Sequence, residues 1–334
     1  VMWLEIISSS EKCYSGGPNF AYDLLLRKVI DSDLGTIDLS NWKVAYSGAE
    51  AVKHNTFKKF SDRFSVCGFD KSAFYPCYGL AEVTVALTGR DVSNKTENIN
   101  IVSSRDDSLH PDPSSGVSFN GNYISCGYVI DNHDMLIVCP SSFYILSENS
   151  VGEVWCQGPS VAQGYWGNED ATKETFHAYT ADGQGPFLRT GDLGFIKDGE
   201  LYVVGRLKDM IIIRGRNYAP QDVECAVEAA HEGIRKGCVA AFGFEDEGVE
   251  KLGVVCEVKR SFVKKGHDEI IQAIIQNITQ ENELSISVIV LLEPGQIFKT
   301  TSGKIQRRKT KQAFLDSDLN VLISWRATDD HTLV

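Results

Sequence analysis

The first 88 residues alternate between the helical and the extended pattern of hydrophobic positions. Residues 20–30, FAYDLLLRKVI, carry apolar side chains at helical spacing, so we predict a helix there. Residues 42–52, WKVAYSGAEAV, indicate a buried strand that ends in a turn of small residues, and a further helix is expected to begin near Val52. This alternation of helices and buried strands is typical of an α/β fold.

The pattern changes between about Gly89 and Asn122. This segment is polar, contains Pro111 and Pro113 and has no strong period, so we expect an inserted surface loop or hairpin over residues 89–122. Short extended patterns separated by turns then predict strands at residues 134–140, 152–158 and 199–205. A β-rich segment is therefore expected to end near Gly205.

A second unit is predicted from Lys208 onward. Residues 219–230, APQDVECAVEAA, favour a helix, because Pro220 and Asp222 suit its first turn. The other expected elements are an amphipathic helix at residues 268–280 and four strands at 209–215, 238–244, 251–259 and 286–292. The second and third of these strands are expected to pair. The chain is thus predicted to form a large domain over residues 1–207 and a small α+β domain over residues 208–334.

Composition limits the classes of protein to which the chain can belong. Its 334 residues suffice for two domains, and 43% hydrophobic and 23% charged residues are ordinary for a globular protein. The formal net charge of −12 argues against nucleic acid as a partner, since a phosphate backbone requires a broad basic surface. The apolar runs are too short to span a bilayer and no signal-peptide pattern is present, so we expect a cytoplasmic protein without a transmembrane segment.

Two further features of the composition matter. The nine cysteines are scattered singly without a CxxC pair, which predicts reduced, mostly buried thiols rather than a zinc site or a disulfide framework. The chain also opens in mid-pattern on Val1, and we expect it to be a fragment.

Residues 298–309, FKTTSGKIQRRK, form a basic stretch in an acidic chain. The stretch contains no acidic residue, and Lys304 directly follows Ser302 and Gly303. One interpretation is a solvated basic face, as for most runs of charge. The other is a mobile loop that presents one ammonium group to a phosphate or a carboxylate.

Five segments of the chain together resemble the signature motifs of the adenylate-forming enzymes. They follow one another in the order YGLAE (78–82), GEVWCQGPSVAQGYWGNEDATKETF (152–176), RTGDLG (189–194), GRLKDMIIIRGRNYAPQDVE (205–224) and KTTSGKIQRR (299–308). Three segments are similar to one branch of that superfamily, the fatty acyl-AMP ligases: GPNFAYDLL (17–25), DLSNWKVAYSGAEAVKHNTFKKF (38–60) and RGRNYAPQDVE (214–224). The insertion at about 89–122 also falls where these ligases carry a segment that braces their two domains.

The resemblance implies a fold and an activity. The fold would be the latter part of a large domain, α/β with a β-barrel-like portion, followed by a small mobile α+β C-terminal domain. The activity would be ATP- and Mg²⁺-dependent conversion of a fatty acid into an acyl adenylate, then transfer to the phosphopantetheine thiol of an acyl carrier protein. The family's phosphate-binding loop would precede residue 1. Two alternatives stay open: a long-chain acyl-CoA synthetase, and a non-catalytic adenylate-binding or interaction module.

Two turns are candidates for nucleotide binding. Ser47, Gly48, Ala49 and Glu50 end a strand with small residues, which let backbone groups approach a flat ligand closely. The resemblance makes that ligand adenine, and the alternative is a tight strand-to-helix turn.

In YGLAE, Tyr78 offers an aromatic face and Gly79 permits close backbone approach. Glu82 offers a hard oxygen ligand suited to Mg²⁺. The alternative is a Tyr-Gly turn with a capping glutamate.

Asp192 and Arg206 are candidates for contact with the ribose and phosphate. The Asp192 carboxylate can accept two hydrogen bonds from a vicinal diol, or it can form an Asx-type turn. Arg206 has the fork geometry for ribose or phosphate oxygens. By resemblance Lys208 is the hinge about which the small domain rotates between two half-reactions; the alternative is an exposed surface lysine. The resemblance also implies that Gly215 lines the pantetheine path.

Lys304 is the candidate catalytic residue. In adenylation a carboxylate attacks the α-phosphate of ATP, and two anions approach only if a positive charge bridges them. By resemblance Lys304 supplies that charge. A separate hypothesis is that Arg307 and Arg308 meet an acidic carrier protein through complementary charge. Phe20 and Tyr22 either line the fatty acid pocket or belong to the ordinary core.

Overall fold

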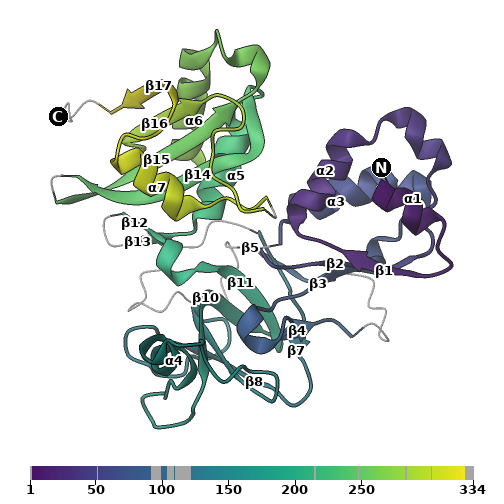
Figure 1. Ribbon diagram of the computed structural model, residues 1–334, viewed down its shortest axis with the longest axis vertical. Helices are drawn as coiled ribbons and strands as arrows, with labels where there is room; N and C mark the ends of the chain where they lie inside the picture. Colours follow the sequence, from purple (N-terminus) through teal and green to yellow (C-terminus); the bar gives the residue numbers. More distant parts are fainter. Residues whose placement is uncertain are drawn as a thin grey trace. The chain divides into compact units, whose positions relative to one another are not determined.

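The structure is a computed structural model, in which the described residues are 2–50, 52–91, 99–103, 109, 122–213, 216–246, 248–282, 284–301 and 303–327 (Figure 1). They form two compact units, and the chain passes from the first to the second between Val204 and Gly205. Most of the expected insertion at 89–122 lies outside the described residues.

The first unit contains four helices and most of the strands that the structure describes. Its helices are α1 (Met2–Ser8), α2 (Asn19–Lys28), α3 (His54–Phe64) and α4 (Glu169–Phe176). Its strands are β1 (Cys13–Gly16), β2 (Trp42–Ser47), β3 (Phe74–Pro76), β4 (Thr88–Gly89), β5 (Ile101–Ser103), β6 (Asn122–Ile124), β7 (Tyr128–Val129), β8 (Asp134–Val138), β9 (Gly152–Gln157), β10 (Leu188–Lys197) and β11 (Glu200–Arg206), the last of which crosses into the second unit.

A small parallel sheet organises the N-terminal part of this unit. Its strand order is β1-β2-β3, and both neighbouring pairs are parallel. The predicted helix at 20–30 is confirmed as α2, the strand from Trp42 as β2, and the helix expected near Val52 begins at His54. Figure 1 shows α1, α2 and α3 on one face of the sheet, and helical spacing on α3 buries Phe57, Phe60 and Phe64 there.

An antiparallel sheet organises the remainder of the first unit. Its strand order is β11-β10-β9-β8, and β8, β9 and β11 confirm the predicted strands. The short pairs β4–β7 and β5–β6 are separate two-stranded sheets. Within the described residues these strands do not close into a barrel, so the expected barrel-like portion is an open sheet with short pairs.

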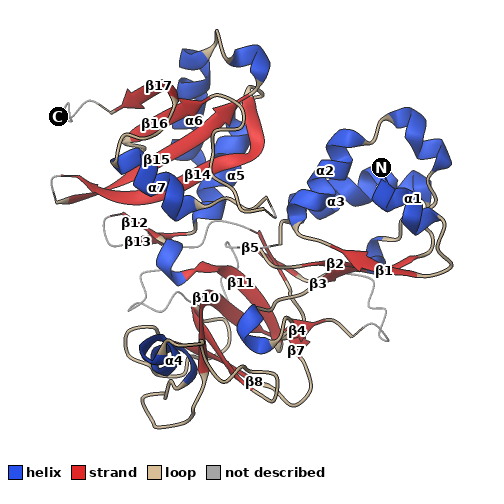
Figure 2. Ribbon diagram, in the orientation of Figure 1, coloured by secondary structure: helices blue, strands red, loops and turns tan. Residues whose placement is uncertain are grey.

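The second unit is a four-stranded sheet with helices. Its elements are β12 (Ile211–Ile213), β13 (Arg216–Tyr218), α5 (Pro220–Ala230), β14 (Ile234–Asp246), β15 (Val249–Val258), α6 (His267–Asn282), β16 (Val288–Leu292), α7 (Arg307–Leu315) and β17 (Val321–Arg326). The predicted α5 and α6 are confirmed. Strands β14 and β15 pair as expected, and the pairing is antiparallel. Strand order is β14-β15-β16-β17, with β15 and β16 parallel (Figure 2).

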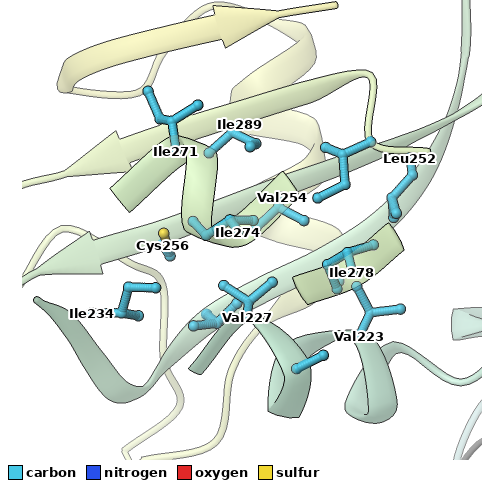
Figure 3. Packing of buried hydrophobic residues seen from close by; sticks show 14 of the residues in the cluster. Val223, Val227, Ile234, Leu252, Val254, Cys256, Ile271, Ile274, Ile278 and Ile289 are labelled. Carbon is cyan, nitrogen blue, oxygen red and sulfur yellow. The ribbon is translucent and has the colours of Figure 1, made fainter. Parts of the chain in front are cut away.

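Alternation along the strands gives this sheet two apolar faces. Val254 and Cys256 on β15 pack with Val227 of α5 and Ile274 of α6 (Figure 3). Val255, between them, faces a second cluster on the opposite side. That second cluster also contains Phe242, Phe244, Val288, Val290 and Leu292, with Phe314 of α7 packed against it. Strand β16 and most of β15 are therefore buried on both faces.

Three expectations from composition can be compared with the described residues. All nine cysteines are described; none forms a disulfide and six are buried, as expected for mostly buried thiols. None of the described helices is both long and apolar enough to cross a bilayer. The same residues contain no group of three or more His, Cys, Asp or Glu side chains placed to hold a metal ion.

Candidate functional site

The turns that follow β2 and β3 leave the same edge of the parallel sheet. Ser47 and Pro76, the last residues of the two strands, are paired in register, and Cys77 N donates to Ser47 O over 2.9 Å. In open α/β sheets ligands bind at the carboxyl ends of the strands. The sheet therefore brings residues 47–50 and 78–82, the two predicted nucleotide segments, to one edge.

The first turn is held by contacts within the protein. A Cβ atom at Gly48 would lie 2.8 Å from Cys77 O, so glycine is needed for the two turns to approach. Ala49 has a φ of +67°, in the left-handed region that few residues other than glycine adopt. Glu50 Oε1 accepts a hydrogen bond from Phe20 N over 3.3 Å, which places a carboxylate at the N-terminus of α2. These contacts match the alternative of a tight turn, and the adenine role stays a prediction.

Tyr22 belongs to the aromatic core. Its side chain is fully buried, its ring stacks on Trp42 with 6.1 Å between centroids, and its hydroxyl donates to Tyr46 O over 2.8 Å. Of the two interpretations of this residue, the packing supports the core rather than the fatty acid pocket. Phe20 is only partly buried, and its role as a pocket residue stays a prediction.

The structure brings Tyr78 and Asp192 together from positions 114 residues apart. The Tyr78 hydroxyl donates to Asp192 Oδ2 over 2.8 Å. The Tyr78 side chain is 9% exposed, so its ring faces the core more than a ligand, and it packs in a cluster with Val83 and Leu87. Burial, together with the Asp192 carboxylate, raises the pKa of Tyr78 well above its usual value of 10.0. The hydroxyl therefore stays protonated and acts as a donor at neutral pH.

A bulge in β10 sets the direction of Asp192. The register between β10 and β9 shifts between Arg189 and Leu193, and Gly191 in this interval has a φ of +70°. A bulge re-aims side chains next to it and favours glycine at a left-handed position. Asp192 N donates to Thr190 Oγ1 over 3.1 Å. The sequence predicted the carboxylate but not the bulge, which RTGDLG signals through Gly191.

Buried Glu153 holds the other side of this bulge. Arg189 Nη2 donates to Glu153 Oε2 over 2.8 Å, and Gly191 N donates to Glu153 Oε1 over 3.1 Å. The Arg189 guanidinium also lies over the ring of Phe143, 5.2 Å from its centroid. The bulge is therefore held by charged hydrogen bonds, which are stronger than neutral ones.

Glu82 is oriented by a tyrosine that sequence analysis did not single out. Tyr165 Oη donates to Glu82 Oε1 over 2.8 Å, and Ala162 N donates to Glu82 O over 2.8 Å. Thr84 Oγ1 donates to Ser160 O over 2.8 Å, and Ser160 Oγ donates to Val83 O over 2.9 Å. The loop at 160–165 is thus fastened to the turn that carries Glu82. The signal was present in QGYWG (163–167), within a segment already recognised as a motif.

Gly79 is required by the backbone. A Cβ atom at this position would collide with the carbonyl oxygen of Val85. We predicted that Gly79 lets the backbone come close to a ligand. In the structure the glycine instead lets two parts of the same turn come close to each other.

In the second unit, Lys304 lies on a hydrogen-bonded hairpin. Lys299 and Ile305 form a β-bridge, and Thr300 N donates to Lys304 O over 2.9 Å. Lys304 N donates to Thr300 Oγ1 over 3.1 Å, and Gly303 has a φ of +85° at the turn. The basic stretch at 298–309 thus has a hairpin at its centre, and its last three residues begin α7.

Arg307 is committed to a buried partner. Arg307 Nε and Nη2 donate to Glu224 Oε1 and Oε2 over 2.6 and 2.8 Å, and Glu224 is 5% exposed. This bidentate pair engages the Arg307 guanidinium, and the contact of Arg307 with a carrier protein stays a prediction. Arg308 is exposed, with its Nε 3.4 Å from Asp209 Oδ1, and its contact with a carrier stays a prediction.

The other residues predicted in this unit are on its surface or outside the description. Arg206 ends β11 and is exposed. Lys208 is exposed in the short 3₁₀ helix Leu207–Asp209, a position that suits both a hinge and a surface lysine. Gly215 lies outside the described residues.

The residues at the sheet edge suit ATP and Mg²⁺ by their chemistry. A carboxylate has roughly four lone-pair positions, so Asp192 can accept hydrogen bonds from several donors at once, of which the Tyr78 hydroxyl is one. Mg²⁺ is commonly held by one or two carboxylates together with water and substrate phosphates. A single partly buried carboxylate, Glu82, therefore fits an ion that the nucleotide brings with it.

Comparison with known proteins identifies the family of the chain. The model of the AMP-binding enzyme family matches residues 2–166, and that of the Disco-interacting protein 2-like AMP domain matches residues 208–324. The chain therefore belongs to the AMP-binding, adenylate-forming enzymes.

Individual relatives point to one branch of this family. The chain is 40% identical to JamA of Moorena producens, named a medium-chain-fatty-acid–[acyl-carrier-protein] ligase, over 98% of this chain and 56% of the relative. A solved fatty acyl-adenylate ligase, from work on the E. coli and L. pneumophila enzymes, superposes with a TM-score of 0.81 at 32% identity, covering 95% of this chain and 55% of that one. The L. pneumophila ligase in complex with acyl adenylate and pyrophosphate is 35% identical, with a TM-score of 0.58, over 97% of this chain and 56% of that one. The chain spans about half the length of these relatives.

Proposed function

We propose that the protein is a fatty acyl-AMP ligase, which activates a fatty acid with ATP and transfers the acyl group to an acyl carrier protein. The observation that carries the proposal is the bond between Tyr78 and Asp192, which orients a carboxylate from β10. The Asp192 carboxylate suits a ribose diol. Its partner Tyr78 lies in the turn after β3, at the edge of the parallel sheet. The name of the relative JamA supports a fatty acid and a carrier protein as substrates.

In the first half-reaction a fatty acid carboxylate oxygen attacks the α-phosphorus of ATP. A new O–P bond forms, the bond to the bridging oxygen breaks, and pyrophosphate leaves. Asp192 binds the ribose, Arg206 contacts ribose or phosphate oxygens, and the turn at Gly48, Ala49 and Glu50 receives adenine. Glu82 would hold Mg²⁺, which supplies charge neutralisation on the phosphates.

Lys304 serves this first step electrostatically. Its ammonium group bridges the two anions as they approach, and such preorganised charge is commonly worth about 10²–10³ in rate. In the second half-reaction the pantetheine thiol attacks the acyl carbonyl carbon. A C–S bond forms, the bond from that carbon to the phosphate oxygen breaks, AMP leaves and the thiol proton is released to solvent. We propose Lys208 as the hinge between the two steps, with the small domain beginning there, and Gly215 as part of the pantetheine path.

The test uses the full-length protein. It is incubated with ATP, Mg²⁺ and a C12 or C16 fatty acid, and acyl-AMP is detected by mass spectrometry. Lys304→Ala is expected to lower acyl-AMP formation by about 10²–10³-fold, whereas Lys264→Ala, at an exposed lysine of the same unit, should have no effect.

The acceptor then separates the alternatives. The accumulated acyl-AMP is challenged with holo carrier protein or with coenzyme A. Transfer to the carrier alone supports the ligase, and transfer to coenzyme A identifies an acyl-CoA synthetase. A folded protein that binds ATP but forms no acyl-AMP with any acid would instead be a binding module.

A further inference from the structure

The hairpin that carries Lys304 is attached to the second unit at both of its ends. Residues 297–307 include this hairpin and its two connections, and each end meets a carboxylate from another element. The two carboxylates are Glu257, on β15, and Glu224, on α5.

The C-terminal attachment is the pair between Arg307 and Glu224. The two hydrogen bonds of 2.6 and 2.8 Å join the guanidinium to both carboxylate oxygens. Glu224 Oε1 also accepts from Ala241 N, on β14, over 3.2 Å. A planar guanidinium paired in this bidentate way fixes direction as well as distance. The end of the hairpin is thus fixed to a helix and a strand through one carboxylate.

The N-terminal attachment uses an even more deeply buried carboxylate. Glu257 is 1% exposed, and its Oε1 accepts from Ile297 N over 2.8 Å. Its Oε2 accepts from Arg235 on β14. Because a buried carboxylate is costly without partners, the backbone at Ile297 cannot move away without leaving Glu257 less satisfied.

Apolar and polar contacts lie between these two attachments. Ile297 and the partly buried Ile305 pack with Cys238 and Ala240 of β14. Lys299 Nζ lies 3.2 Å from Cys238 Sγ. The base of the hairpin is therefore packed on the sheet, while Lys304 lies beyond it toward the turn.

We propose that Glu224, Arg307 and Glu257 are positioning residues for Lys304 in the adenylation step. The inference rests on the proposed function and adds residues that act through the lysine rather than on the substrate. A lysine side chain is long and flexible, so its charge is placed accurately only if its backbone is fixed. The two buried carboxylates provide that fixed backbone.

The experiment measures the two half-reactions separately in the full-length protein. Acyl-AMP formation is followed with ATP and a C12 fatty acid, and transfer is followed with preformed acyl-AMP and holo carrier protein. The variants are Arg307→Lys, which keeps the charge and removes the bidentate fork, and Glu257→Gln, which keeps the volume and removes the charge. Arg260→Lys is the matched control, because Arg260 is an exposed arginine of the same unit.

We expect each of the two variants to lower kcat for acyl-AMP formation by roughly 10²-fold, the effect of a misplacement of about 1 Å. Transfer from preformed acyl-AMP and the KM for ATP should match wild type. A misfolded variant would lose both half-reactions, so retained transfer shows that the fold is intact.

Two results would overturn the inference. One is full adenylation activity in Arg307→Lys and Glu257→Gln. The other is parallel loss of both half-reactions in both variants, which would assign the carboxylates to stability alone. If wild type itself forms no acyl-AMP, the proposed function fails first, and that result is distinct from a failure of the variants alone.

Discussion

At the scale of single residues, the carboxylates at the candidate nucleotide site are oriented by tyrosine hydroxyls. Tyr78 donates to Asp192 and Tyr165 donates to Glu82, both over 2.8 Å. Each donor comes from a segment distant in sequence from its acceptor. A carboxylate that is fixed before the ligand arrives loses less conformational freedom on binding.

We predict that Tyr78→Phe weakens ATP binding. Asp192 loses a hydrogen bond to a charged acceptor, and such bonds are worth about 1.5–3 kcal/mol, so the KM for ATP should rise roughly tenfold or more. Steady-state acyl-AMP formation measures this change. Tyr202→Phe is the control, because the Tyr202 hydroxyl also donates to a carboxylate, that of Glu200, over 3.3 Å. An equal rise in both variants would contradict the assignment of Asp192 to the nucleotide.

We predict that Tyr165→Phe raises the Mg²⁺ concentration needed for half-maximal activity. Removal of a hydrogen bond to a metal ligand commonly costs about 10–100-fold in metal affinity. A Mg²⁺ titration at saturating ATP gives the value, with Tyr144→Phe, at an exposed tyrosine, as the control. An unchanged titration would show that Glu82 does not hold the ion.

At the scale of elements, periodicity predicted α2, α5, α6 and many of the strands, but it missed others, including the ten-residue strand β10. α5, α6 and β14 have several turns or alternations, so the pattern is repeated often enough to be recognised. The terminal helix α1 and strands β1 and β17 were not predicted. All three are short or partly exposed. Strand β1 pairs with β2 and strand β17 pairs with β16, so their formation depends on residues elsewhere in the chain.

We predict that Gly191→Ala damages ATP binding through the β10 bulge. The φ of +70° at this residue is strained for alanine, while a Cβ atom would meet nothing within 4 Å. A left-handed alanine costs about 1–2 kcal/mol. Gly183→Ala has the same properties, with a φ of +85° and no neighbour within 4 Å. Chemical denaturation should show similar losses in both variants, and only Gly191→Ala should raise the KM for ATP.

At the scale of the whole molecule, buried thiols make stability depend on pH. The pKa of Cys256 is raised from 9.0 to about 12, and burial of the thiol is the largest cause. Above pH 9 the thiol therefore ionises first in the unfolded state, and the free energy of unfolding falls until the folded pKa is reached. This contribution is present below pH 9 and is lost between pH 9 and pH 12.

We predict that Cys256→Ala removes part of this alkaline destabilisation. The difference in unfolding free energy between wild type and variant should shrink by about 1.4 kcal/mol from pH 8 to pH 10. Denaturant titrations at the two pH values measure it. Val254→Ala truncates a neighbouring buried residue of the same cluster and should lose the same stability at both pH values. A constant difference for Cys256→Ala would contradict the raised pKa.

The sequence by itself determined the class of fold and the family. Ordered motifs and regular periodicities are local patterns, so they can be recognised without coordinates. The candidate residues Asp192, Glu82 and Lys304 were identified in the same way, because their types suit the chemistry of a nucleotide and two anions.

Only the tertiary structure decided which residues act on one another. The partners Tyr78 and Asp192, Tyr165 and Glu82, and Arg307 and Glu224 are separated by 114, 83 and 83 positions. Tyr22 suits a pocket or a core equally well by its type, and packing placed it in the core. Hydrogen bonding and burial depend on distances in space, which a linear pattern does not contain.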